Sequence, residues 1–330
     1  MLIALSSLLK AIIIAQIWLQ ILGDLEVCDG FMALVAGKYP WRVDESCVES
    51  IVRLQERFFI LSQQMIMMKA NLTVFVSHSN YVICDLKLPN IIVQSFDAKE
   101  LLIHYGFGEA IDSMNKWRLK SYTRTSDLLR ILLARRFRMT YIDTDIHFLN
   151  TSREVFFRPF VGAAIWSDVK CGIELTNSAF CLQSNVLDEM IEFLRLRIGK
   201  GSSNYQYTEL GPAMFQKLLM NKNFAVSLYS QNHPVQSTID DIYRSYSRYH
   251  HTHLHLTGHI RKGHLKQSKH RLKDITPYSL LISDVRARLA LPPILAMNTT
   301  ALTSEPDSAQ GYLDRIDPLS WWLFSTDALV

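Results

Sequence analysis

The feature that most constrains the fold is a predicted helix that passes directly into a short apolar strand ending in two carboxylates. The helix covers residues 125–137, where leucine and isoleucine recur at helical spacing, and the strand begins at Thr140. Asp143 and Asp145 stand where this strand stops, and their spacing predicts that both side chains point to the same side of an extended segment. Ligands in open α/β sheets bind at the carboxyl ends of strands, so this point of the chain is a candidate site.

The same alternation of helix and strand runs through most of the chain. Short runs predict strands at 31–36, 73–77, 91–95, 160–165 and 176–182, and those at 73–77 and 91–95 are β-branched runs typical of buried parallel strands. Helical patterns cover 45–69, 99–104, 111–117, 125–137 and 185–198, and another helix begins at Gly211-Pro212, where proline suits the first turn. Strands that alternate with helices predict an α/β fold with a mostly parallel sheet and helices on both faces.

Two further charged residues belong to this candidate site. Asp127 and Arg130 lie three residues apart on the predicted helix, so they share one of its faces. Hard divalent cations are commonly held by one or two carboxylates together with phosphate oxygens, and Asp143 and Asp145 offer such carboxylates. The arrangement indicates a nucleotide-sugar site, with a metal ion on the diphosphate and the helical pair on the sugar. The simpler interpretation is a solvated turn beside a surface ion pair of little energetic weight, but the strand-end position favours a functional site.

Residues 125–130 and 141–146 resemble the DXD sugar-binding region of glycosyltransferases, specifically the α-1,4-galactosyl- and α-1,4-N-acetylglucosaminyltransferases. The resemblance covers residues 31–260, and several motifs in the right order are more specific than any one of them. The other segments that match the family are Cys47-Val-Glu-Ser50, Asn90 to Asp97, Asn177-Ser-Ala-Phe180, Gly211-Pro212 and His253-Leu-His255-Leu256.

This resemblance implies a GT-A fold, a Mn²⁺ ion and retention of anomeric configuration. The implied reaction moves a hexose, most readily galactose, from a UDP-sugar to a glycolipid or glycan acceptor. Two alternatives stay open: a transferase with UDP-N-acetylglucosamine as its donor, and a catalytically inactive, glycan-binding descendant of the fold. The implied ligands of the metal ion and diphosphate are Asp143, Asp145 and His255, and the implied sugar and reaction-centre residues are Asp127, Arg130 and Asn177.

The chain departs from this family just before the DXD strand, where Arg138-Met139 replaces a Gly-Gly pair. Glycine permits a positive φ, which arginine and methionine tolerate less easily. The departure predicts either a rebuilt turn or a displaced site. The first predicted strand also lacks the family's polar Glu-Thr-Ser ending, because Phe31-Met-Ala-Leu-Val35 is wholly apolar.

The N-terminus predicts a membrane anchor. Residues 1–23 are almost wholly apolar apart from Lys10, and a bilayer span takes about 20 residues. A cleaved signal peptide is the alternative. Either an anchor or a signal peptide would direct the expected transferase domain, residues 24–273, into the secretory lumen. We expect a single-pass type II protein of the Golgi membrane. Glycosylation sequons agree with this, and they begin at Asn71, Asn150 and Asn298.

Charge and composition exclude one class of partner. The formal net charge of +4 is too small to indicate nucleic-acid binding, and neither an aromatic-rich RNA-binding signature nor zinc-finger spacing occurs. Residues 274–330 lie beyond the resemblance and are expected to form a C-terminal extension, in which Pro292-Pro293 indicates a linker. Trp321-Trp322 could pack back on the domain or contact a partner or membrane surface.

Five cysteines could pair in an oxidising lumen. Cys47 and Cys84 match positions where the family has cysteines, so the resemblance implies that pair. Cys171 and Cys181 could bridge a β-turn region or remain buried free thiols. Cys28 would then be left over for an intermolecular bond.

Histidines gather late in the chain, with seven of the 11 between residues 244 and 273. A strand would present His251, His253 and His255 on one face, which could hold zinc, although a solvated basic strand is the commoner arrangement. The family resemblance favours His255 as the functional histidine, with Lys262 or Lys266 near the diphosphate.

Overall fold

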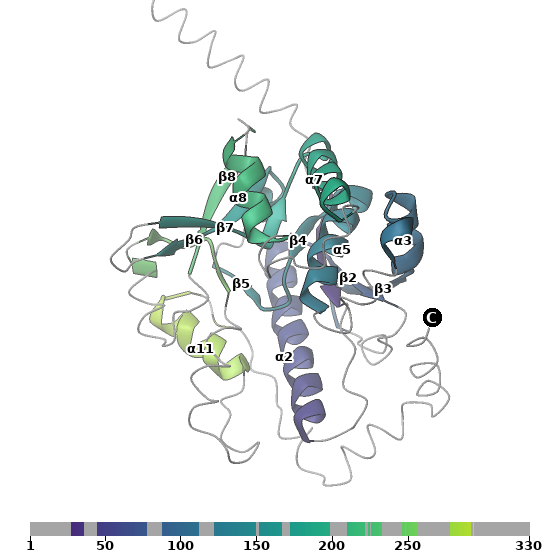
Figure 1. Ribbon diagram of the computed structural model, residues 1–330. Helices are drawn as coiled ribbons and strands as arrows, with labels where there is room; N and C mark the ends of the chain where they lie inside the picture. The colour runs from purple at the N-terminus through teal and green to yellow at the C-terminus, as the bar shows by residue number, and fades with distance from the viewer. Residues whose placement is uncertain are drawn as a thin grey trace, which may run out of the picture.

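The strands of the described residues form one mixed sheet of nine strands in a computed structural model (Figure 1). The structure describes residues 28–35, 45–77, 88–111, 122–149, 152–166, 172–198, 210–221, 224, 226–232, 246–247, 249–255, 278–291 and 293. The strands are β1 (Phe31–Val35), β2 (Leu72–Ser77), β3 (Ile91–Phe96), β4 (Thr140–Ile142), β5 (Ile146–Phe148), β6 (Phe160–Trp166), β7 (Gly172–Cys181), β8 (Ser227–Gln231) and β9 (His253–His255).

The sheet has the order β3-β2-β1-β4-β7-β6-β8-β9-β5. The strands β3, β2, β1 and β4 run parallel to one another, and β7 runs antiparallel to β4 and β6. Beyond β6, β8 and β9 continue in parallel pairing, and β5 closes the edge in the antiparallel direction. Five of the eight pairings are parallel, so the predicted mostly parallel sheet is confirmed.

Helices cover both faces of this sheet, as the alternating sequence pattern predicts. The α-helices of the described residues are α2 (Glu45–Met68), α3 (Ala98–His104), α5 (Tyr122–Phe137), α6 (Arg153–Phe156), α7 (Ser184–Ile198), α8 (Pro212–Asn221) and α11 (Tyr278–Arg288), and Gly108–Ala110 form a 3₁₀ turn. One apolar core holds buried residues of α3, α5, α7 and α8, and a second core holds those of α2 and α6. Figure 1 shows the long α2 apart from the group of α3, α5 and α7.

Strand β1 shows how the chain supplies both cores. Met32 and Leu34 lie in the core of α5 and α7, whereas Phe31, Ala33 and Val35 lie in the core of α2. Successive side chains of a strand point to opposite faces, so a strand in the middle of a two-sided sheet has to be apolar throughout. This placement accounts for the absence of polar side chains in Phe31–Val35.

The turn between α5 and β4 keeps a left-handed residue although the chain has no glycine there. Arg138 has a φ of +54°, and its N–H donates to the carbonyl oxygen of Ala134 at 2.9 Å. Its own carbonyl accepts the N–H of Asp29 at 2.7 Å, which ties the turn to the residues before β1. This conformation costs a non-glycine residue about 1 kcal/mol or more. The turn is therefore kept with Arg138 in a strained conformation, and the DXD segment still follows β4.

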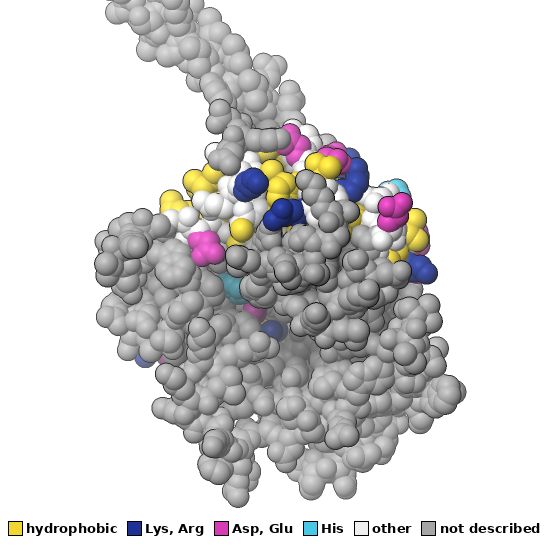
Figure 2. Space-filling view, viewed as in Figure 1, with side chains coloured by type: hydrophobic (Ala, Val, Ile, Leu, Met, Phe, Trp, Pro, Cys, Tyr) yellow, Lys and Arg dark blue, Asp and Glu magenta, His cyan; other side chains and the backbone are white. Residues whose placement is uncertain are grey.

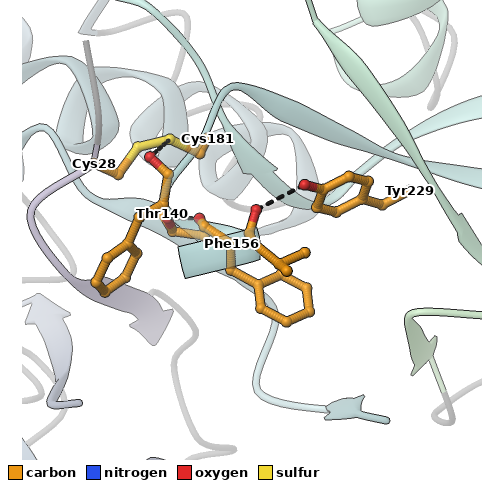
Figure 3. The surroundings of a disulfide bond; sticks show 7 residues. Cys28, Thr140, Phe156, Cys181 and Tyr229 are labelled. Atoms are coloured by element: carbon orange, nitrogen blue, oxygen red, sulfur yellow. Dashed lines mark hydrogen bonds between the residues drawn. A yellow bond between two sulfur atoms is a disulfide. The ribbon is translucent and has the colours of Figure 1, made fainter. Parts of the chain in front are cut away.

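A disulfide joins Cys28, ahead of β1, to Cys181 at the end of β7, with their Cα atoms 6.2 Å apart (Figure 3). The predicted Cys171–Cys181 bridge and a left-over Cys28 are therefore wrong. The bridge forms because β4 is paired with both β1 and β7, which brings together ends that are 153 residues apart in sequence. Cys84 lies outside the described residues, so the Cys47–Cys84 pair stays a prediction.

Side chains around this disulfide fasten helix α6 to the sheet. The Thr140 hydroxyl donates to the carbonyl oxygen of Phe156 at 2.6 Å, and the Tyr229 hydroxyl donates to that of Val155 at 2.7 Å (Figure 3). Both hydroxyls come from strands, and both acceptors belong to α6. The carbonyl groups at the end of a helix lack intrahelical partners, so these bonds satisfy them.

Helix α11 shows that part of the C-terminal extension packs on the domain. Ile282 and Val285 share a small apolar cluster with Ile60 of α2, Leu149 and Leu254. Arg286 of α11 is buried, and its Nη1 lies 3.2 Å from Nε2 of His147 in β5. The described part of the extension therefore covers the edge of the sheet at β5.

Several predicted features lie outside the described residues: residues 1–23, nearly all of 111–117, Asn150, Asn298, Lys262, Lys266 and Trp321-Trp322. Among the described helices, none combines the length and the apolar character that a membrane span requires. Asn71 is exposed just before β2. Over α7 and α8, Figure 2 shows apolar, acidic and basic side chains intermixed.

Candidate functional site

The two carboxylates of the DXD segment lie in a turn, not on the extended segment that the sequence predicted. Asp143 follows the last residue of β4, and the N–H of Ile146 donates to the carbonyl oxygen of Asp143 at 3.1 Å. The N–H of Asp143 donates to the carbonyl oxygen of Ser178 at 2.7 Å, which holds the turn against β7. The chain has to bend here because β4 and β5 occupy distant places in the sheet order.

This turn brings together a group that can hold a metal ion. The ligand atoms of Asp143, Asp145 and His255 all lie within 4.8 Å of one another, and this is the one such group among the described residues. His255 reaches the turn because β9 pairs with β5, with Ile146 directly opposite His255. The His255 Nε2 lies 3.3 Å from Asp145 Oδ1. Two carboxylates and one imidazole fit a divalent cation such as Mn²⁺, with water or phosphate oxygens completing its shell.

Asp143 is oriented by two side chains that contact the same carboxylate oxygen. The Tyr141 hydroxyl donates to Asp143 Oδ1 at 2.6 Å, and Arg130 Nη1 lies 3.3 Å from that atom. The Tyr141 ring is itself fixed, because it stacks on Phe180 and lies under the Arg130 guanidinium. The Asp143 side chain keeps 24% of its surface exposed, the largest share of the site's charged side chains in these ion pairs. The second oxygen can therefore face a ligand while the first holds the position.

Arg130 connects the metal-ligand group to helix α5. Its guanidinium contacts Asp143 on one side and lies 3.2 Å from Asp127 Oδ1 on the other. It also donates to the carbonyl oxygen of Asn177 at 2.8 Å and to the Ser126 hydroxyl at 3.2 Å. Arg130 is buried, and these contacts occupy most of its N–H groups. The predicted role of Arg130 as a sugar ligand stays a prediction, and the structure adds that it joins two carboxylates.

Asn177 completes the second half of the site. Its Nδ2 donates to Asp127 Oδ1 at 2.7 Å. Asn177 lies in an irregular stretch of β7 opposite Gly162, where the register with β6 shifts. Bulges re-aim side chains and are frequent beside active sites, and this one turns Asn177 toward α5. Gly211, just before α8, leaves room for the pair, because a Cβ there would lie 2.7 Å from Asn177 Nδ2.

The pKa values of the carboxylates Asp127 and Asp145 shift in opposite directions in the two halves of the site. Burial raises the pKa of Asp127 to about 6, against the opposing effects of Arg130 and of the Asn177 hydrogen bond. Burial acts in the same direction on Asp145, but His255 outweighs it and lowers the pKa of Asp145 to about 2. Burial alone would lower the pKa of His255, yet the Asp145 carboxylate raises it. The metal-ligand half therefore contains an ion pair, whereas Asp127 ionises near neutral pH.

The other two histidines of the alternating run do not join this group, so a three-histidine zinc site is not formed by them. Nδ1 of His251 lies 2.7 Å from the Ser230 hydroxyl, and Nε2 of His253 lies 2.8 Å from Gln231 Oε1. Burial lowers the pKa of His251 to about 4 and that of His253 to about 3. Both side chains are buried and hydrogen-bonded, and both are neutral at pH 7.

The structure brings together all six site residues that the sequence predicted, in two adjoining groups joined by Arg130: Asp143, Asp145 and His255, then Asp127, Arg130 and Asn177. The sequence did not identify the roles of Tyr141 and Asn232. Tyr141 is two residues from Asp143, which is a spacing that could have suggested contact. Asn232 reaches His255 across 23 residues of chain, and nothing local indicates it.

Comparisons with known proteins give little beyond this geometry. No family model matches the chain, and no curated protein matches it. Among the solved structures, the chain is similar to one named PaToxG glycosyltransferase, with 12% sequence identity and a TM-score of 0.42 over 88% of this chain and 89% of that one. Because this TM-score is below 0.5, neither the fold family nor the function of the chain follows from that similarity.

Proposed function

We propose that this protein is a metal-dependent glycosyltransferase of GT-A type that transfers a hexose from a UDP-sugar with retention of configuration. The observation that carries the proposal is the joining of two groups by Arg130. On one side lie two carboxylates and an imidazole within 4.8 Å of one another, and on the other lies the buried Asp127–Asn177 pair. A nucleotide sugar presents a negatively charged diphosphate next to a sugar ring that carries hydroxyl groups. The metal-ligand group suits the diphosphate, and the adjoining Asp127–Asn177 pair suits the hydroxyl groups.

Each residue of the site has a distinct role in this proposal. Asp143, Asp145 and His255 would hold Mn²⁺, which when bound neutralises charge on the diphosphate leaving group. Asp127 accepts hydrogen bonds from sugar hydroxyl groups, because its second oxygen is not the one that Asn177 contacts. Arg130 fixes the distance between the two carboxylates. Positioning of the anomeric carbon in this way lowers the entropy cost of reaching the transition state.

We propose substitution at the front face of the sugar, assisted by the leaving phosphate. Asp127 is the carboxylate of the sugar half, and it is 4% exposed and bonded to both Asn177 and Arg130. A carboxylate held in that way suits hydroxyl binding better than attack on carbon. The donor we propose is UDP-galactose and the acceptor a glycolipid or glycan, with UDP-N-acetylglucosamine as the second donor candidate.

A lumenal location is also proposed. The Cys28–Cys181 disulfide supports it, because disulfides form and persist in oxidising compartments. The proposed orientation is a type II Golgi protein anchored by residues 1–23. An inactive, glycan-binding descendant is the competing class, and the feature that favours it is Arg138-Met139 in place of the Gly-Gly pair before β4. Arg138 adopts the required left-handed φ, so that departure does not argue for a displaced site.

The test is a donor screen with the full chain in detergent, in which UDP release is measured for UDP-galactose, UDP-glucose and UDP-N-acetylglucosamine. We expect release that requires Mn²⁺, stops with a chelator and is lost in Asp127→Asn. Asp188→Asn is the matched control, because Asp188 is an exposed carboxylate paired with Arg135 on the surface. Donor binding without release by any of the three sugars would favour the inactive descendant.

A further inference from the structure

The end of strand β8 contacts the histidine of the metal-ligand group through an asparagine side chain. The Nδ2 of Asn232 donates to the carbonyl oxygen of His255 at 3.0 Å, and the N–H of His255 donates to Asn232 Oδ1 at 2.7 Å. Both backbone groups of His255 are thus bonded to one side chain. A carboxamide offers the same donor and acceptor as a peptide group, so the side chain continues the pairing that joins Gln231 to His253.

This contact holds His255 from the side opposite to its strand partner. On one side, β5 pairs with β9 and places Ile146 opposite His255. On the other side, the backbones of β8 and β9 pair at Gln231 and His253, and the Asn232 side chain bonds the backbone of His255. His255 is the last residue of β9, and strand ends are where local opening is easiest. The asparagine therefore supplies the restraint at the point where the strand stops.

Asn232 is itself held firmly. It is 0% exposed, as is its neighbour Gln231. Gln231 Oε1 accepts hydrogen bonds from the hydroxyl groups of Thr176 at 3.2 Å and Ser178 at 3.1 Å. The same oxygen lies 2.8 Å from Nε2 of His253. Gln231, the residue before Asn232, is thus hydrogen-bonded to both β7 and β9.

We propose that Asn232 is a positioning residue that fixes His255 for metal binding. The inference rests on the proposed metal site and deepens it, because it names a residue that controls the site without contacting the ion. With the end of β9 bonded to Asn232, the imidazole lies 3.3 Å from Asp145 Oδ1, and the three ligand atoms lie within 4.8 Å of one another. Groups that orient metal ligands typically change metal affinity by about 10- to 100-fold when they are removed.

The experiment measures Mn²⁺ binding to the full chain without nucleotide, by electron paramagnetic resonance of the free ion. Asn232→Ala removes both hydrogen bonds, and we expect Mn²⁺ affinity to fall by about tenfold or more. His255→Ala and the double variant complete a mutant cycle. If Asn232 acts through His255, the double variant binds Mn²⁺ no more weakly than His255→Ala alone. Ser62→Ala is the matched control, because it removes a buried hydroxyl of α2 that donates to the Pro89 carbonyl, and the Mn²⁺ affinity of this variant should be unchanged.

Hydrogen exchange of the metal-free protein gives a second readout. The amide of His255 should exchange faster in Asn232→Ala, and Asn232→Ser, which keeps one hydroxyl, serves if the alanine variant does not fold. Unchanged Mn²⁺ affinity in the Asn232 variants, with a loss in His255→Ala, would overturn the inference and leave the proposed function standing. Additive losses in the double variant would also overturn it. A wild-type chain that binds no Mn²⁺ would overturn both.

Discussion

Replacement of Arg130 by lysine tests whether one guanidinium joins the two halves of the site. The change keeps the charge but loses the planar fork, and a single ammonium cannot bond Asp127, Asp143 and the carbonyl of Asn177 together. A hydrogen bond to a charged group contributes about 1.5–3 kcal/mol, and breaking a buried ion pair costs about 3–5 kcal/mol. Lysine should retain one carboxylate contact, so we expect the free energy of unfolding to fall by about 3 kcal/mol.

The effect on catalysis should be comparable in free energy to the effect on stability, because a 100-fold loss of rate corresponds to about 2.7 kcal/mol. A misplacement of about 1 Å can lower a rate by about 100-fold, and Arg130→Lys releases both carboxylates from their fixed separation. The assays are denaturant unfolding and UDP release at saturating Mn²⁺. Arg135→Lys is the control, because Arg135 forms an exposed pair with Asp188 at 2.7 Å and such pairs contribute at most about 1 kcal/mol. If Arg130→Lys behaves like Arg135→Lys in both assays, Arg130 does not join the two halves and the reasoning is refuted.

Three other changes follow from single features of the site. The pKa of Asp127 is about 6 against an ordinary value of 3.8, so the folded state binds this proton more tightly than the unfolded state does. The free energy of unfolding should therefore fall by about 3 kcal/mol as pH rises from about 4 to 6. Denaturant unfolding of wild type should show this pH dependence, and Asp127→Asn should lack it. Gly211→Ala places a Cβ 2.7 Å from Asn177 Nδ2 and should lower UDP release by about tenfold, whereas a Cβ at Gly30 meets nothing closer than 3.9 Å and Gly30→Ala should be active. Arg138→Gly relieves a φ of +54° and should raise the melting temperature by about 2 °C.

Each of these has an outcome that counts against it. Identical pH slopes in wild type and Asp127→Asn would mean that Asp127 ionises normally in the folded protein. Equal activity of Gly211→Ala and Gly30→Ala would mean that the Asn177–Asp127 pair tolerates displacement. A lower melting temperature for Arg138→Gly would mean that the unfolded-state entropy of glycine outweighs the strain at Arg138.

Local patterns in the sequence predicted most of the longer elements of the fold, but not β5, β8, α6 or α11. The helix that carries Asp127 and Arg130 and the apolar strand before Asp143 both form, because their hydrophobic spacing matches a helix face and a buried strand. The uniformly apolar sequence of β1 likewise fits a strand that is buried on both faces. These features depend on neighbours within a few residues, where periodicity is informative.

Features set by sheet order could not be predicted in that way. The Cys28–Cys181 bridge joins residues that meet only because β4 lies between β1 and β7. The support of His255 by Asn232 similarly needs β8 beside β9. The bend at Asp143 and Asp145 follows from the separation of β4 and β5 in the sheet, which a period-two pattern does not contain.

The most direct test of the account is calorimetry of UDP binding to the full chain with and without Mn²⁺. The account predicts that wild type binds UDP with an affinity that depends on Mn²⁺, and that Asp143→Asn and Asp145→Asn each remove this dependence while both variants still fold. Asp188→Asn should bind UDP as wild type does, because its carboxylate lies on the surface beside Arg135. Mn²⁺-independent UDP affinity in wild type, or unchanged UDP affinity in both DXD variants, would contradict the assignment of this turn as the metal and diphosphate site.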